Sequence, residues 1–235
     1  LVNWLIHLSG RRTGLASARG LYMNQRLVDA KDARVFEASQ RLLINRALDA
    51  AVFENTPLQV LDEGLPYDRC LVGVLTDMPD HTGLQDHDVQ TPEQVRQVVR
   101  TQIDLVLPEG VAVLNAEDPA LVDMAHLCDG EVIYHAHDAN HPTIVSHLAQ
   151  QGRAVVRQQN QVLLLNGPHS QVLLDLDFPA IAKQLKDGVI HPDNLLAAVA
   201  VAWALALSPD LIRAGLKNYG QPAAMANVDL ARIKT

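Results

Sequence analysis

Acidic and imidazole side chains gather just after a short apolar run in VLTDMPDHTGLQDHD, residues 74–88. The run at 71–75 has the length and composition of a buried strand. Carboxylates and imidazoles that follow the carboxyl end of such a strand are typical of a ligand site in an α/β protein. Asp80 and His81 are therefore candidates for a metal and phosphate site, or for the remains of one.

Other residues that could do chemistry give weaker signals. His135 and His137 flank an alanine, so their imidazoles lie on one side of the chain if it is extended. That spacing could bind a transition metal, although a polar loop after a strand is the commoner reason for such a pair. None of Ser9, Ser146 and Ser170 lies in a nucleophile-elbow setting, so the sequence gives no support for a hydrolase.

Composition limits the kind of partner. A net charge of −8 over 235 residues argues against non-specific nucleic-acid binding, but it does not exclude a nucleotide held by backbone amides and a metal. The two cysteines have no zinc-type spacing, which indicates a reduced, cytoplasmic compartment. The longest apolar stretch, 195–207, is too short to span a bilayer and has no signal-peptide layout, so we expect no membrane association.

Alternating strands and helices must position these residues. The apolar periodicity and the capping residues predict an α/β protein of three layers, with a mostly parallel sheet flanked by helices. Helices are expected at 1–8, 35–48, 91–107 and 120–128, a hairpin within 19–28, and strands at 50–53, 70–75, 110–115 and 131–134.

The texture changes after residue 150. Short alternating strands and polar turns predict a small antiparallel β appendage at about 150–178. A helix that is apolar nearly all round follows from His191, and Ser208 caps a last helix that ends near residue 220. Residues 221–235 are interpreted as a linker. Since the chain starts at Leu1 and is already helical there, a fragment is one interpretation.

Five stretches carry a resemblance to a known family. Their order and spacing, over most of residues 1–220, are similar to those of the central ATP-binding domain of the Mur ligase family, and most of all to the Mur-ligase-like part of the cyanophycin synthetases. They read EGLPYDRCLVGVLT, DHTGL, PEGVAVLNAEDP, CDGEVIY and NLLAAVAVAWALALSPDLIRAGL.

The resemblance implies a domain at 1–220 and a linker at 221–235 toward an absent C-terminal domain. It also implies an ATP-dependent amide ligase, which phosphorylates a carboxylate for attack by an amino group, with ATP and Mg²⁺ as cofactors. The partners implied are the flanking domains of a larger ligase or a second copy in a homo-oligomer.

Four site residues follow from the resemblance, each with a structural alternative. Glu54 and His81 match metal-site residues, but they could equally be an exposed acid at a strand end and a histidine hydrogen-bonded at a turn. Asn194 matches the second asparagine of the family's adenine-contacting Asn-x-x-Asn motif, and His191 occupies the place of the first, so adenine could meet one amide and one imidazole. Alternatively, His191 only precedes the helix, and Asn194 satisfies one of its free amides.

Several positions depart from the family pattern. No Gly-x-x-x-x-Gly-Lys phosphate loop occurs in the chain, and Val99 occupies the place of the carbamylated lysine. Thr76 replaces an asparagine, and Pro57 lies where the family has a glycine-containing stretch.

These departures favour a degenerate domain with a scaffold or regulatory role, without assigned catalytic residues and with weak or absent ATP and Mg²⁺ binding. Two alternatives are a fragment of an active ligase whose phosphate loop lies upstream, and a non-catalytic binder of a small ligand. In a degenerate domain we expect the Asp80 carboxylate to accept hydrogen bonds from the backbone amides ahead of it. We expect the His81 side chain to pair with a group in its own loop or with Glu54.

Overall fold

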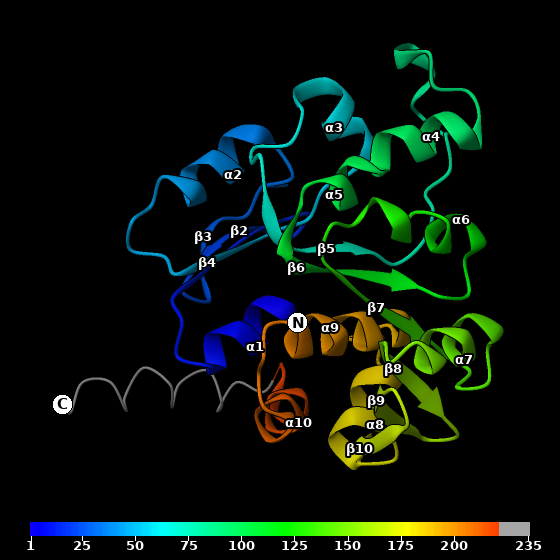
Figure 1. Cartoon of the computed structure of the whole chain (residues 1–235). Helices are drawn as coiled ribbons and strands as arrows, with labels where there is room; N and C mark the ends of the chain where they lie inside the picture. Colours follow the sequence, from blue (N-terminus) through cyan, green and yellow to red (C-terminus); the bar gives the residue numbers. More distant parts are fainter. Residues whose placement is uncertain (221–235) are drawn as a thin grey trace, which may run out of the picture.

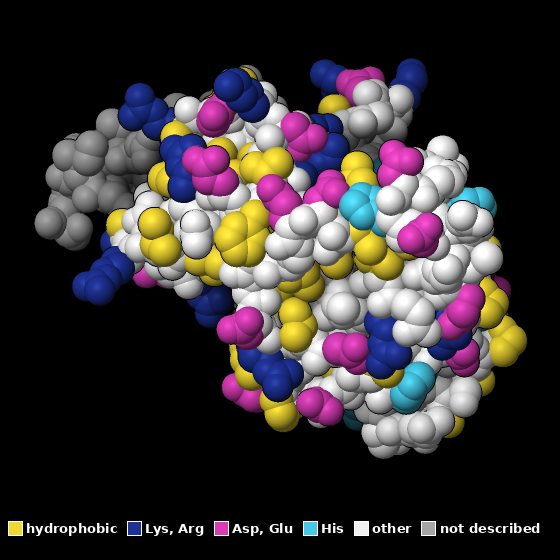
Figure 2. Space-filling view, turned by 90° about the horizontal axis from the view of Figure 1, so that it is seen from above, with side chains coloured by type: hydrophobic (Ala, Val, Ile, Leu, Met, Phe, Trp, Pro, Cys, Tyr) yellow, Lys and Arg dark blue, Asp and Glu magenta, His cyan; other side chains and the backbone are white. Residues whose placement is uncertain are grey.

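The computed structural model describes residues 1–220 and shows two β-sheets with helices on both faces (Figure 1). The α/β class and the mostly parallel main sheet predicted from the sequence are confirmed, whereas the division into two sheets was not predicted. Seen from above, the surface mixes hydrophobic side chains with acidic and basic ones (Figure 2). Within residues 1–220, none of the helices is long and apolar enough to cross a lipid bilayer.

The smaller sheet has the strand order β3-β2-β1-β4. Strands β1, β2 and β3 are antiparallel, and β4 pairs in parallel with β1. The predicted hairpin is β2–β3, which turns at Asn24 and Gln25 with φ of 50° and 66°, as a two-residue turn with both central residues left-handed requires. The strands are β1 (Thr13–Ser17), β2 (Gly20–Met23), β3 (Arg26–Asp29) and β4 (Ala50–Phe53).

The larger sheet has the strand order β10-β9-β8-β7-β6-β5. Pairing is parallel from β5 to β8 and antiparallel from β8 to β10. The predicted antiparallel strands are therefore present, and they continue the main sheet, because the helix α7 (Pro142–Ala149) carries the chain back so that β8 pairs with β7. The strands are β5 (Cys70–Leu75), β6 (Val106–Asn115), β7 (Glu131–Ala136), β8 (Arg153–Gln158), β9 (Gln161–Asn166) and β10 (His169–Asp175).

Short helices cover one face of this sheet. The predicted helix at 91–107 is two helices, which end before β6 begins at Val106, and Thr91 opens the first with a capping box to Gln94. The predicted helix at 120–128 is one short helix and a 3₁₀ turn. With α7, the helices on this face are α3 (Pro57–Glu63), η1 (Gln85–His87), α4 (Pro92–Val99), α5 (Thr101–Asp104), α6 (Pro119–Val122) and η2 (Ala125–Leu127). Helix α2 (Phe36–Leu43) packs on the smaller sheet instead, and α8 (Pro179–Lys186) packs in the apolar cluster on the opposite face of the larger sheet.

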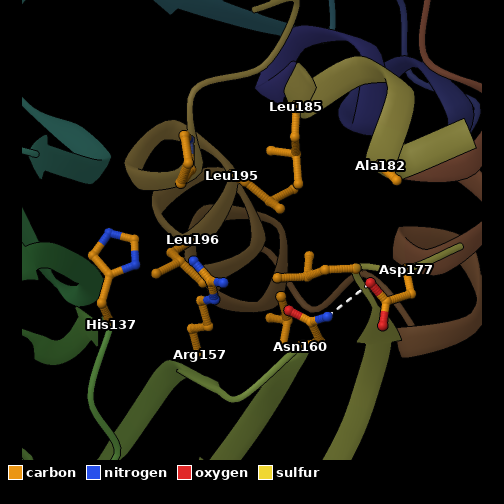
Figure 3. Close-up of a pocket in the computed structure, with 11 residues that line it drawn as sticks. His137, Arg157, Asn160, Asp177, Ala182, Leu185, Leu195 and Leu196 are labelled. Atoms are coloured by element: carbon orange, nitrogen blue, oxygen red, sulfur yellow. Dashed lines mark hydrogen bonds between the residues drawn. The ribbon is translucent and has the colours of Figure 1, made fainter. Parts of the chain in front are cut away.

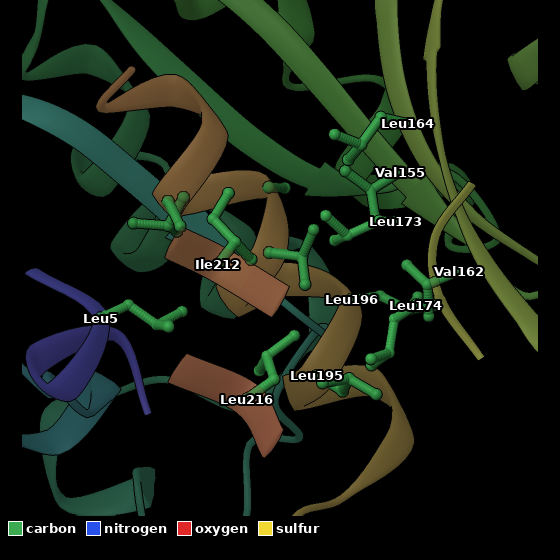
Figure 4. Close-up of a cluster of buried hydrophobic side chains, with 14 of the residues drawn as sticks. Leu5, Val155, Val162, Leu164, Leu173, Leu174, Leu195, Leu196, Ile212 and Leu216 are labelled. Atoms are coloured by element: carbon green, nitrogen blue, oxygen red, sulfur yellow. The ribbon is translucent and has the colours of Figure 1, made fainter. Parts of the chain in front are cut away.

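The helix α9 (Pro192–Ala204) lies against the other face and is buried, as its apolar sequence predicted. The helices α1 (Val2–Leu8) and α10 (Pro209–Asn218) pack beside it (Figure 4). The indole of Trp4 donates a hydrogen bond of 2.9 Å to the carbonyl of Gly215, which ties α1 to α10. Ser208 caps α10 by accepting the amide of Leu211. The linker predicted at 221–235 lies outside the described residues.

Strand β5 approaches α5 so closely that only glycine fits at position 73. A Cβ on Gly73 would lie 2.4 Å from the carbonyl oxygen of Gln102 and 2.8 Å from the side chain of Val106. Because the nearest atom is backbone, the helix would have to move. We therefore expect Gly73→Ala to lower the free energy of unfolding by about 2–3 kcal/mol, measured by urea denaturation.

The matched control is Leu71→Ala in the same strand, since the side chain of Leu71 is 53% exposed. Its effect should stay within about 0.5 kcal/mol. Equal losses in the two variants would contradict the close approach of α5.

Candidate functional site

Side-chain hydrogen bonds join the carboxyl ends of three parallel strands. The side chain of Asn115, at the end of β6, donates to the carbonyl of Thr76 after β5, at 3.0 Å. The carboxylate of Glu117 accepts the amide of His137 after β7, also at 3.0 Å. The loops that follow β5, β6 and β7 therefore form one polar rim, at the edge of the sheet where α/β proteins bind ligands.

Asp193, in the first turn of α9, connects two histidines at this rim. One carboxylate oxygen bonds the Nε2 of His137, and the other lies 3.1 Å from the Nδ1 of His191. Burial opposes the negative charge, but the hydrogen bond from His137 and the nearby imidazoles together hold the pKa of Asp193 below its ordinary value. Asp193 thus joins the loop after β7 to the amino end of α9.

His135 is on β7, two residues before His137, and is 1% exposed. Its Nε2 is buried and has no hydrogen-bond partner in the described part of the chain. Burial lowers the pKa of this imidazole to about 4, because a charged ring would be cut off from water. His135 is therefore neutral at pH 7.

The structure brings together only part of the predicted adenine side. His191 precedes α9, is exposed, and pairs with Asp193, while Asn194 is exposed in the first turn of the helix. Asp193, which connects the cluster, was not predicted as a site residue. Its only sequence signal is the acidic residue beside Pro192 in a first helical turn. Adenine contact by His191 and Asn194 stays a prediction.

Glu54, predicted at the metal site, follows β4 of the smaller sheet. Its carboxylate accepts the amide of Ala18 at 3.1 Å and lies 3.6 Å from the guanidinium of Arg34. The positive guanidinium of Arg34 already neutralises part of the negative charge of this carboxylate, and a divalent cation would need that charge in a ligand. Across residues 1–220, no three or more His, Cys, Asp and Glu side chains are grouped so that they could hold a metal ion.

The loop after β5 contains Asp80 and His81. Asp80 accepts the backbone amide of Thr82 at 2.7 Å, as expected for a turn, and the hydrogen bonds from Thr82 lower the pKa of the carboxyl. We expected the His81 ring to pair within its loop or with Glu54, and this pairing is not found. Within residues 1–220 the ring makes no side-chain hydrogen bond, and its one electrostatic partner is the neighbouring Asp80. Metal binding by Glu54 and His81 stays a prediction.

Val99, at the position of the family's carbamylated lysine, ends α4 with 5% of its surface exposed. It belongs to an apolar cluster that includes Val95 and Ile103, both fully buried. Pro57 is the first residue of α3, whose amino end is capped by the hydroxyl of Thr56. Two departures from the family pattern are thus built into regular helices.

Solved structures define the class of fold. A UDP-N-acetylmuramoyl-L-alanyl-D-glutamate–2,6-diaminopimelate ligase superposes with a TM-score of 0.65 and 13% sequence identity, over 92% of this chain and 42% of that one. MurF from Acinetobacter baumannii superposes with a TM-score of 0.54 and 14% identity, over the same shares. The chain has a Mur-ligase-like fold.

Sequence comparison gives a narrower relationship. The chain is 29% identical over 214 residues to cyanophycin synthetase from Synechocystis sp., and 29% identical over 217 residues to that from Geminocystis herdmanii. These matches cover 90% and 92% of this chain and 24% of each relative, so the chain spans about a quarter of their length. No protein-family model matches it. The chain is a homologue of part of cyanophycin synthetase, which confirms the resemblance.

The buried imidazole of His135 should make the fold sensitive to acid. Its pKa in the folded chain is about 4, whereas an unfolded chain has the ordinary value near 6.5. Between these values the unfolded chain binds a proton that the folded chain does not, so stability falls as the pH is lowered from about 6.5 to 4. We expect His135→Leu to flatten this dependence, by on the order of 3 kcal/mol over the window, in denaturant titrations at stepped pH.

The control is His169→Leu, at the exposed start of β10. It should keep the acid sensitivity of the unmodified chain. If His135→Leu is as sensitive to acid as the control, the buried imidazole is not the cause.

Proposed function

We propose that this chain is a Mur-ligase-like domain that keeps the fold of an ATP-dependent ligase without its chemistry, and that it acts as a scaffold or regulatory domain. The observation that carries the proposal is the burial of Val99 in an apolar cluster. By resemblance, this position holds the lysine whose carbamate binds a metal. A valine cannot form a carbamate, and the neighbouring residue Arg100, paired with Asp104, stays protonated.

The residues that the resemblance assigns to Mg²⁺ and ATP do not fit those groups well in this chain. The carboxylate of Glu54 already has a cationic partner in Arg34 and an amide partner in Ala18. Mg²⁺ requires near-octahedral oxygen ligands, which a single carboxylate shared with a guanidinium does not supply. The 235 residues also contain no Gly-x-x-x-x-Gly-Lys stretch to cradle a triphosphate.

A scaffold or regulatory role requires a surface for a partner, which could be a flanking domain or a second copy of the chain. Helices α2 and α3, in the upper part of Figure 1, carry exposed apolar side chains near their ends. Leu43 and Ile44, at the end of α2, are 46% and 72% exposed, and Leu58 in α3 is 43% exposed. Exposed apolar groups of this kind support contact with another protein surface.

One observation favours a second candidate, a piece of an active carboxylate–amine ligase. The chain spans only about a quarter of its cyanophycin synthetase relatives. In that case ATP, Mg²⁺ and the acyl acceptor would be bound jointly with residues outside the 235. Measurement of ADP release by the complete natural protein distinguishes the candidates, since only an active ligase would form ADP with an amino acid and a carboxylate present.

The proposal predicts that the chain does not bind Mg·ATP tightly. In calorimetric titration we expect no saturation up to about 1 mM Mg·ATP, because no lysine-bearing phosphate loop neutralises the phosphates. A cyanophycin synthetase is the positive control, and His81→Ala should leave the result unchanged. A dissociation constant in the low micromolar range that His81→Ala abolishes would sink the proposal.

A second prediction concerns the Val99 position directly. Val99→Lys should lower the free energy of unfolding by more than about 3 kcal/mol, because the substituted ammonium would be buried without a partner. Gln97→Lys, on the exposed side of the same helix, should change it by less than about 0.5 kcal/mol. Denaturant unfolding measures both. A Val99→Lys chain as stable as the control would show that a lysine is tolerated here, which contradicts the argument for lost chemistry.

A further inference from the structure

A small cavity lies between the larger sheet and the helices α8 and α9 (Figure 3). Its volume is about 150 Å³, the share of roughly five water molecules in the liquid. Strands β8 and β9 and the segment after β10 form one side, and α8 and α9 form the other. His137 lies at one end, so the cavity adjoins the cluster around Asp193 without using His191 or Asn194.

Two opposite charges line this cavity without pairing with one another. Arg157 donates its Nε to the carbonyl of Gln159 at 3.0 Å, and within residues 1–220 its guanidinium is in no salt bridge. Asp177 accepts the side-chain amide of Asn160 on one oxygen, at 2.7 Å (Figure 3). The terminal nitrogens of Arg157 and the second oxygen of Asp177 are thus available to a ligand.

The wall opposite these charges is aliphatic. Leu195 and Leu196 of α9, each 2% exposed, line it, and the fully buried Val162 of β9 adds an aliphatic group on the side of the sheet. The lining of the cavity contains no Phe, Tyr or Trp side chain. A ligand that fills it therefore combines a small aliphatic part with polar groups, which is the usual composition of a small-molecule site.

We infer that the cavity binds a small zwitterionic amino acid with an aliphatic side chain, such as leucine or valine. The ligand carboxylate meets Arg157, the ligand ammonium meets Asp177, and the aliphatic side chain lies on Leu195 and Leu196. A simple anion would face Asp177, and a simple cation would face Arg157, so either leaves one charge of the cavity without a partner. A zwitterion satisfies both.

This inference goes beyond the proposed function and does not depend on it, since it involves neither ATP nor a metal. It adds a means of regulation, because the walls of the cavity belong to α9 and to the loop of His137, the two parts that Asp193 joins. Titrations with Mg·ATP and with amino acids test the two ideas separately.

The test is a titration of the ¹⁵N-labelled chain followed by NMR, with L-leucine, L-valine and glycine as ligands. Two matched analogues each lack one charge: 4-methylpentanoate has no ammonium, and 3-methylbutylamine has no carboxylate. We expect leucine or valine to bind with a dissociation constant below about 1 mM and to shift signals of α9 and the β8–β9 turn. Glycine and both analogues should bind at least about tenfold more weakly, because each lacks one of the three contacts.

Three variants localise the binding. Arg157→Gln and Asp177→Asn should each weaken binding at least about tenfold. Ala182→Trp, at an exposed position of α8 in the lining of the cavity, should block the cavity. Arg46→Gln and Asp187→Asn, at exposed positions outside the lining, are the controls and should bind normally. The spectra show directly whether each variant is folded.

Two results would overturn the inference. One is the absence of signal shifts with either aliphatic amino acid at about 10 mM, far above the expected dissociation constant. The other is binding that the two charge variants leave unchanged, or that 4-methylpentanoate or 3-methylbutylamine matches, because the opposite charges of the cavity would then have no part in recognition.

Discussion

The burial of α9 is the constraint on which the rest of the structure depends. Every side chain in 195–202 is buried, and the helix contacts β6, β7 and β8 as well as α1 and α10. Alanines at four of these eight positions allow the helix to lie close to the sheet. Since Asp193 and the leucines of the cavity wall belong to this one helix, its packing fixes both the polar cluster and the cavity.

The polar rim shows how a buried edge of a sheet can keep its charges. Asp193 in α9 retains its negative charge in a partly buried place because the imidazoles of His137 and His191 face it, whereas the fully buried His135 on β7 is neutral. The site therefore combines a charged carboxylate on α9 with a neutral imidazole on β7, which are distant in the sequence. Such an arrangement couples the loop after β7 to α9 through electrostatics rather than through packing alone.

Local patterns predicted the elements well, and long-range pairing explains most of what was missed. Strands β4 and β5 have the predicted bounds because each is an apolar run between polar residues. Helices α7 and α8 were not predicted, since neither has a long apolar period, and the link from β7 to β8 was missed with α7.

The cluster at Asp193 could not be predicted from the sequence because His137 lies 56 residues before Asp193, and the Glu54–Arg34 pair likewise joins two separate segments. The burial of Val99 could be predicted from the sequence, because a spacing of four residues from Val95 places both side chains on the same, buried side of α4.

The change from parallel to antiparallel pairing at β8 has a consequence for how the chain folds. Strands β8, β9 and β10 are joined by tight turns, so their contacts are local in sequence and need little loop closure. Strands β5 and β6 instead pair across intervening helices, with Val72 opposite Val111. Hairpins form on a timescale of about microseconds, and distant parallel pairs form more slowly. The antiparallel half of the sheet is thus suited to form early and to offer β8 as the edge on which the parallel half is assembled.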